Sequence, residues 1–119
     1  MQRILFVDDD FAVAEVTRMV LEHEGYTVLV AGNGEDAFHA VETERPDLVI
    51  TDFMMPIMNG GQLVRLMRDA PLLKNIPIIM VTANAASEIE GAEHCAKVMH
   101  KPITIDQLLE AIREVLKER

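Results

Sequence analysis

The amino-acid sequence predicts an α/β fold in which helices cover both faces of a five-stranded parallel sheet. Five short runs of Val, Ile and Leu show no alternation of apolar and polar residues, and such runs are typical of strands buried on both faces. The segments between the runs repeat their apolar residues with helical spacing. Strands that alternate with helices form βαβ units. The 119 residues suit a single domain, 1–119.

The strands and the first helix can be placed along the chain. We expect strands at residues 4–7, 28–31, 48–51, 78–82 and, with a weaker pattern, 96–99. The first helix should follow Asp10 as its N-cap and end at Gly25, a residue that tolerates the left-handed conformation of a helix end. The side chains expected to face the sheet from this helix are those of Ala12, Val16, Met19 and Val20.

Three further helices follow the same reasoning. The second should end before Pro46 and the third should run from about Gly60 to a point before Pro71, because the residue preceding a proline disfavours helical geometry. The last helix should follow a cap at Thr104 or Asp106. Its apolar stripe comprises Ile105, Leu108, Leu109, Ile112, Val115 and Leu116.

Charge and cysteine content exclude some classes of protein. The formal net charge is -9, which argues against binding of a nucleic-acid backbone by this chain, because phosphate contacts need clustered Lys and Arg. Cys95 is the single cysteine, so an internal disulfide is impossible and a reducing compartment is expected. The apolar run at residues 4–7 is too short for a signal peptide or a membrane span, so we expect a soluble, cytoplasmic protein.

Polar residues follow the predicted strands where each strand ends, and parallel strands bring these ends to one edge of the sheet. Clustered carboxylates repel one another unless a cation lies among them, and an all-oxygen ligand set suits Mg²⁺. A carboxylate beside Mg²⁺ can attack a phosphoryl group, whose charge an ammonium and a hydroxyl can then stabilise. The residues in question are Asp8, Asp9, Asp10, Asp52, Thr82 and Lys101.

These motifs resemble the receiver domain of two-component response regulators. The shared pattern consists of Val7-Asp8-Asp9-Asp10, Asp52-x-x-Met55-Pro56-x-x-Asn59-Gly60, Thr82-Ala83 and Lys101-Pro102, and it covers nearly the whole chain. The resemblance implies a doubly wound, flavodoxin-like (βα)5 fold with strand order 2-1-3-4-5. It implies a signalling switch that catalyses its own phosphorylation and dephosphorylation and is not otherwise an enzyme.

The resemblance also implies a role for each matching residue. Asp52 would accept a phosphoryl group from a sensor histidine kinase or a histidine phosphotransfer protein. Asp9, Asp52 and the backbone carbonyl of Met54 would bind Mg²⁺, and Asp8 would hold a metal-bound water. Lys101 and Thr82 would contact the phosphoryl group. The Lys101-Pro102 bond would be cis. The output would be a downstream protein or a domain outside this chain, and the receiver would act as a monomer or a phosphorylation-dependent dimer.

The sequence departs from the family pattern between Thr82 and Lys101. Val98 stands where the family usually has Tyr or Phe, and the stretch is shorter than usual by about one helical turn. We therefore expect a short or irregular fourth helix, with a cap at Ser87, and an altered coupling between the site and the output surface.

Two other functions are open at this stage. A phosphohydrolase of the haloacid-dehalogenase type would use Asp8 as the nucleophile, since Asp8 and Asp10 form an Asp-x-Asp motif after the first strand. Against it, the motif around Asp52 would have no role. A pseudo-receiver that only binds proteins is the second alternative, and the intact set of Asp52, Thr82 and Lys101 argues against it.

Overall fold

The computed structural model describes residues 2–83 and 89–117 and contains one sheet of five parallel strands in the order β2-β1-β3-β4-β5. The strands are β1 (Arg3–Val7), β2 (Thr27–Ala31), β3 (Leu48–Asp52), β4 (Ile78–Thr82) and β5 (Lys97–His100). The helices are α1 (Phe11–His23), α2 (Gly34–Glu44), α3 (Gly60–Asp69) and α4 (Ile105–Lys117), with a short 3-10 helix, η2 (Ala92–His94). The predicted fold class and strand order are confirmed.

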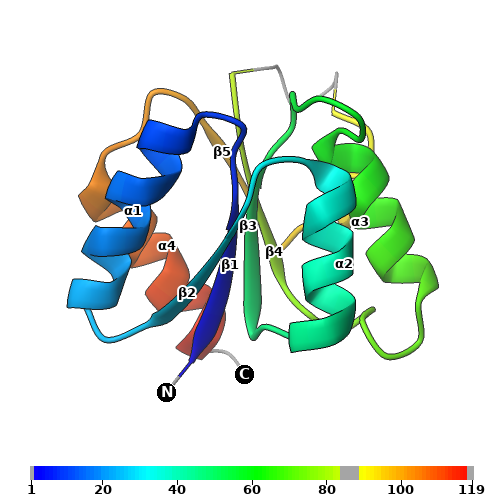
Figure 1. The fold of residues 1–119 in the computed structure, drawn as a ribbon, viewed down its shortest axis with the longest axis horizontal. Coiled ribbons are helices and arrows are strands. Elements are labelled where there is room, and N and C mark those ends of the chain that lie inside the picture. The colour runs from blue at the N-terminus through cyan, green and yellow to red at the C-terminus, as the bar shows by residue number, and fades with distance from the viewer. Residues whose placement is uncertain (1, 84–88, 118–119) are drawn as a thin grey trace.

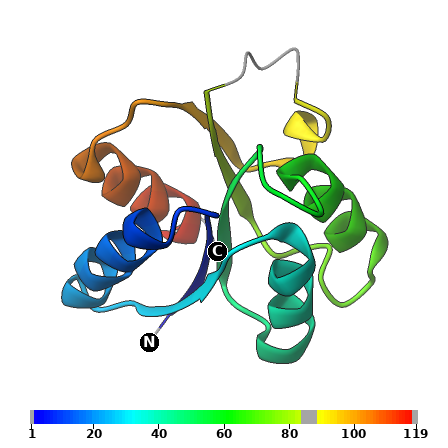
Figure 2. The same cartoon turned by 45° about the horizontal axis from the view of Figure 1, so that its top comes forward.

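Helices cover both faces of the sheet, as Figures 1 and 2 show. The pair α1 and α4 lies on one face, and α2 and α3 lie on the other. Side chains of β1 alternate between the two layers: Ile4 and Phe6 pack toward α1 and α4, whereas Leu5 and Val7 pack toward α2 and α3. Both sets are buried, so apolar residues are needed at each of these four positions.

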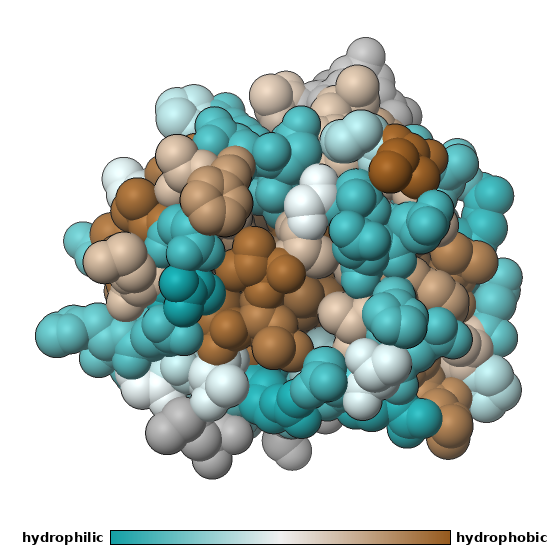
Figure 3. Space-filling model, in the orientation of Figure 1, coloured by the Kyte–Doolittle hydropathy of each residue, from teal (hydrophilic) through white to brown (hydrophobic). Residues whose placement is uncertain are grey.

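The free edge of the sheet at β2 stays partly open between the two helical layers. Figure 3 shows apolar side chains at the surface between α1 and α2, where β2 passes. Leu29 and Val30 of β2 are only half-buried. The opposite edge is formed by β5.

Each helix begins after a polar residue whose side chain accepts a hydrogen bond from a backbone N–H three residues later, which satisfies one of the unpaired donors of the first turn. These residues are Asp10, Asn33, Asn59 and Thr104. The expected caps at Asp10 and Thr104 are confirmed, and Gly25 has a φ of 100°, as a left-handed helix end requires.

The expected inner face of α1 is wrong. Val16 and Met19 are 61% and 64% exposed, whereas Ala14 and Leu21 are buried against the sheet. Apolar residues occupy nearly the whole circumference of this helix, so their spacing does not select one face.

The connection between β4 and β5 contains no fourth helix of ordinary length in its described part. After Ile89 the chain forms only the 3-10 turn η2 and then enters β5. The expected short or irregular helix is thus confirmed for residues 89–96, whereas the expected cap at Ser87 lies outside the described residues. Strand β5 begins at Lys97, one residue later than expected.

This connection packs directly on α3. The Arg68 guanidinium donates hydrogen bonds to the carbonyl of His94, at 2.8 Å from Nη2, and to those of Lys74 and Ile76, at 3.0 and 2.9 Å from Nη1. Arg65 pairs with Glu90. Side chains of α3 thus contact this connection at Glu90 and His94, and Arg68 also binds the loop that precedes β4.

Candidate functional site

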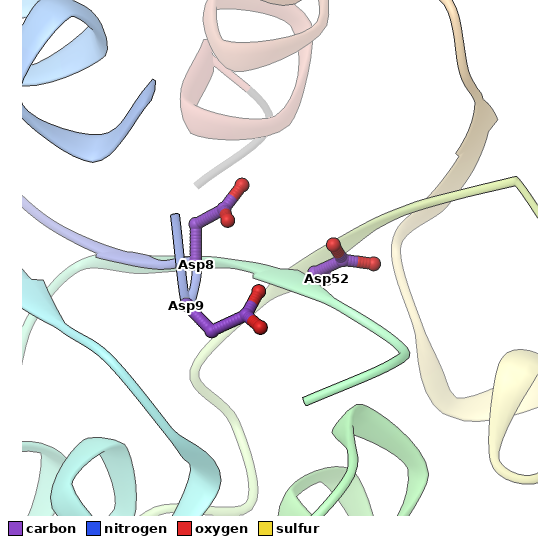
Figure 4. Close-up of side chains that lie close together, drawn as sticks. All are labelled: Asp8, Asp9 and Asp52. Carbon is purple, nitrogen blue, oxygen red and sulfur yellow. The ribbon is translucent and has the colours of Figure 1, made fainter. Parts of the chain in front are cut away.

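Three carboxylates meet at the carboxyl ends of two adjacent inner strands, β1 and β3. Asp8 and Asp9 follow β1, and Asp52 is the last residue of β3. These strands are hydrogen-bonded neighbours, and Val7 lies opposite Thr51. The residues that follow this pair, Asp8 and Asp52, therefore lie close together. One oxygen from each carboxylate lies within 4.8 Å of the others (Figure 4). The site predicted from the strand ends is thus assembled by the sheet itself.

The three carboxylates differ in exposure. Asp8 is 8% exposed, Asp52 is half-buried and Asp9 is exposed. The Asp8 side chain accepts a hydrogen bond of 2.9 Å from the N–H of Asp10, which fixes its position. Asp10 itself caps α1 and is not part of the cluster that could hold a metal ion.

Burial raises the pKa of Asp8, and the negative charges of Asp52 and Asp9 raise it further. The hydrogen bond from Asp10 and the positive charge of Lys101 act in the opposite direction without cancelling the effect. The ionised form of Asp8 is therefore costly in the protein alone, and a divalent cation among the carboxylates would relieve that cost.

Lys101 lies against Asp52, and its Nζ donates a hydrogen bond of 2.7 Å to Asp52 Oδ2. The backbone N–H of Lys101 bonds to the carbonyl of Thr82 at 2.8 Å, so the residue is held just beyond the end of β5. Although partial burial of the ammonium acts the other way, the hydrogen bond to Asp52 and the charges of Asp52, Asp8 and Asp9 raise the pKa of Lys101. The Lys101-Pro102 bond is cis, as expected.

The two other expected site residues lie nearby in different environments. Thr82 is fully buried at the end of β4, and the neighbouring Val81 lies opposite Asp52. The Met54 side chain is 62% exposed in the loop after β3. Both residues thus lie at the carboxyl ends of strands, at the same edge of the sheet as the carboxylates.

Two further residues support the main chain of Asp52: Thr51, which the sequence reasoning missed, and Gly60, which was expected at the start of α3. The buried Thr51 hydroxyl donates a hydrogen bond of 2.9 Å to the Asp52 carbonyl. At Gly60, a Cβ atom would meet that same carbonyl oxygen at 2.5 Å, so only glycine lets α3 begin this close. A hydroxyl in an otherwise aliphatic strand was the available signal for Thr51.

The residues present fit Mg²⁺. The donor set is carboxylate oxygen only, one of the carboxylates is costly to ionise alone, and Mg²⁺ takes few protein carboxylates and keeps several waters. Among the described residues, the group formed by Asp8, Asp9 and Asp52 is the one cluster of His, Cys, Asp or Glu with suitable spacing for a metal ion.

Comparisons with known proteins agree with the fold. The sequence model of the response regulator receiver domain matches residues 4–113. The chain is 39% identical over 119 residues to the DNA-binding response regulator MtrA of Mycolicibacterium paratuberculosis, covering 98% of this chain and 52% of MtrA. It is 35% identical to the response regulator MprA of Mycolicibacterium vanbaalenii, covering 97% of this chain and 50% of MprA. The chain thus spans about half the length of the curated relatives it matches.

Solved structures show the same likeness. The response regulator TrrA of Thermotoga maritima, determined in complex with Mg²⁺ and BeF, has a TM-score of 0.86 and 31% identity, covering 97% of this chain and 99% of that one. The signal receiver domain of a signal transduction histidine kinase from Syntrophus aciditrophicus has a TM-score of 0.91 and 30% identity, covering 99% and 92%.

The chain belongs to the response regulator receiver family: it is a receiver domain of two-component signalling, a switch that phosphorylation activates. Receiver domains bind Mg²⁺ at their acidic cluster, which corresponds here to Asp8, Asp9 and Asp52. Neither the phosphohydrolase nor the pseudo-receiver alternative gains support. In the part of the chain that the structure describes, no helix has the length and apolar character needed to span a bilayer.

Proposed function

We propose that Asp52 is the phosphoacceptor, with Lys101 and Thr82 as its catalytic partners. The observation that carries this assignment is the 2.7 Å contact between Lys101 Nζ and Asp52 Oδ2 beside two further carboxylates. Asp52 combines a partly exposed carboxylate with a neighbouring ammonium. Asp8, by contrast, is nearly buried, and its oxygen is engaged by the N–H of Asp10, which makes it the poorer nucleophile.

The metal ligands in this proposal are Asp9, Asp52 and the backbone carbonyl of Met54, with Asp8 acting through a water. Bound Mg²⁺ supplies positive charge that offsets the negative charge of the carboxylates and of an incoming phosphoryl group. An Asp52 oxygen forms a bond to phosphorus as the bond between phosphorus and the histidine nitrogen of the donor breaks, and the donor imidazole leaves with that electron pair. Lys101 neutralises charge on the phosphoryl oxygens. The Thr82 hydroxyl then donates a hydrogen bond to one of these oxygens. Water later attacks phosphorus, the bond from phosphorus to the Asp52 oxygen breaks, and inorganic phosphate leaves, so Asp52 is a free carboxylate again.

The partners follow from family membership. The phosphoryl donor would be a sensor histidine kinase or a histidine phosphotransfer protein in the cytoplasm. MtrA is named a DNA-binding response regulator, but residues 1–119, which we propose form one domain, carry a net charge of -9 and would not bind DNA themselves. The phosphorylated receiver would act on a downstream protein or output domain, as a monomer or as a phosphorylation-dependent dimer.

The test is intact-mass analysis after incubation with Mg²⁺ and acetyl phosphate, for the wild type and for Asp52→Asn. We expect one phosphoryl adduct in the wild type, none in Asp52→Asn, and none in the wild type with excess chelator. Binding of beryllofluoride with Mg²⁺, followed by NMR, checks the same site without a reactive donor.

An adduct that persists in Asp52→Asn would refute the assignment and favour Asp8. Labelling that survives the chelator would refute the metal requirement. A wild type that forms neither the adduct nor the beryllofluoride complex would refute the proposed function as a whole.

A further inference from the structure

A cavity of about 710 Å³ adjoins the carboxylates and extends between α1 and the start of α4. One end of the cavity is polar and includes Asp52 and Lys101. The rest of its wall is largely aliphatic and includes Val13 of α1 and Ile103, Ile105 and Leu108 from the α4 end. Phosphorylation of Asp52 explains the polar end but requires no aliphatic wall.

The aliphatic wall is open to a ligand. Val13 is 44% exposed and Ile105 is 40% exposed, while Leu108 forms part of the buried floor. The two helices lie side by side on one face of the sheet (Figures 1 and 2). The volume falls within the range of roughly 300–1,000 Å³ that small-molecule sites usually have.

The charge at the polar end selects the head group of the ligand. The Lys101 ammonium and a cation bound by the carboxylates would together attract a phosphoryl group to Asp52. A group attached to that phosphoryl group would lie next to the aliphatic wall, because Asp52, Lys101 and the aliphatic side chains line the same cavity. This arrangement fits a small molecule with a phosphoryl head and a short hydrocarbon chain.

We propose that the cavity binds the hydrocarbon chain of a small acyl phosphate, so that the site prefers donors with a chain longer than acetyl. The inference rests on the proposed role of Asp52. In the reaction, an Asp52 carboxylate oxygen forms a bond to phosphorus and the bond between phosphorus and the acyl oxygen breaks. The acyl carboxylate leaves with the electron pair of that bond, and no oxidant, reductant or proton is consumed.

The test compares two unreactive probes, methylphosphonate and butylphosphonate, in the presence of Mg²⁺. Each methylene that leaves water improves affinity about fourfold, so three additional methylenes that are half-buried should improve it about eightfold. NMR titration of the 119-residue chain gives both dissociation constants. The matching reaction is labelling by butyryl phosphate against acetyl phosphate, where we expect a similar ratio of second-order rate constants.

The variant Val13→Ser tests the wall, and Val16→Ser is its matched control. Both replace an exposed valine of α1 by serine, but only Val13 lines the cavity. We expect Val13→Ser to weaken butylphosphonate about threefold and to leave methylphosphonate unchanged. Val16→Ser should change neither dissociation constant.

Equal affinities for the two phosphonates would overturn the inference and leave Asp52 as the acceptor; the cavity would then serve a protein donor or no ligand. An equal loss of affinity in both serine variants would overturn it as well. If neither phosphonate binds, the inference is also wrong, and the beryllofluoride complex then shows separately whether the proposed function stands.

Discussion

Replacing Asp8 by Asn should stabilise the metal-free protein. The Asn side-chain oxygen can still accept the hydrogen bond from Asp10, so the substitution mainly removes a charge. Asp8 faces two negative charges, on Asp9 and Asp52, and one positive charge, on Lys101. Removal of the Asp8 charge therefore relieves a net repulsion of about one pair of like charges.

The size of that repulsion follows from the spacing of the cluster. Two unit charges at the limit of 4.8 Å repel by about 3 kcal/mol at an effective dielectric constant of about 20, and by about 1 kcal/mol in water. Because Asp8 is nearly buried and Asp9 is exposed, the value should lie between these limits. A gain of about 1–3 kcal/mol corresponds to a rise in Tm of roughly 4–12 °C for a domain of this size.

The assay is thermal unfolding by circular dichroism at pH 7, with and without Mg²⁺, and Asp10→Asn is the control. Asp10 is exposed, and Asn caps a helix as well as Asp does, so this variant removes one charge without relieving the cluster. Mg²⁺ should stabilise the wild type clearly and Asp8→Asn less, since loss of a residue that orients metal ligands weakens affinity about tenfold or more.

The pH dependence has a defined sign. The pKa of Asp8 is raised above its usual 3.8, so its ionisation costs stability above the folded-state pKa, and the cost vanishes at low pH, where the residue is protonated in both states. The extra stability of Asp8→Asn over the wild type should therefore disappear as the pH falls toward the usual pKa of 3.8. A metal-free Asp8→Asn protein that is less stable than the wild type at pH 7 would refute the reasoning, as would an equal gain in Asp10→Asn.

Three further outcomes are expected. Lys101→Met should keep the fold and slow phosphorylation of Asp52 about tenfold. The loss is smaller than for a buried donor, because the Lys101 ammonium is partly exposed, and an unchanged single-turnover rate would exclude a role of Lys101 in the reaction. Burial raises the pKa of Cys95 to about 11, so alkylation at pH 8 should be about a hundredfold slower than in the urea-unfolded chain, and equal rates would contradict this. Arg68→Gln should lower the free energy of unfolding by about 2 kcal/mol and speed hydrogen exchange in residues 89–96, whereas Arg65→Gln, at an exposed ion pair, should cost less than about 1 kcal/mol.

The sheet and the acidic site were predictable because one rule connects them. Asp8, Asp52 and Lys101 each end a strand or directly follow one, and parallel strands end at a common edge, so sequence order alone places these three residues together. The short spacing between Thr82 and Lys101 likewise predicted a short or irregular fourth helix, and residues 89–96 agree with that prediction.

Other features depend on contacts that periodicity does not encode. The predicted orientation of α1 was wrong because apolar residues surround the helix. Packing on β1 and β2 decides which of them are buried, and these are Ala14 and Leu21. The attachment of residues 89–96 to α3 depends on Arg68, whose side chain donates to the backbone carbonyl of His94. Every residue carries such a carbonyl, so the sequence does not indicate the partner of Arg68. The cavity depends on how far α1 lies from α4, a distance that neither helix determines alone.

The position of the two chain ends has a practical consequence. The start of β1 and the end of α4 both lie at the edge of the sheet opposite the carboxylates, where the N and C labels stand in Figure 1. A fluorophore, a surface anchor or a fused protein joined at either end would be held away from Asp52 by about the length of a strand. Receivers immobilised through these ends should present Asp52 outward, which suits direct measurement of phosphonate binding on a sensor surface.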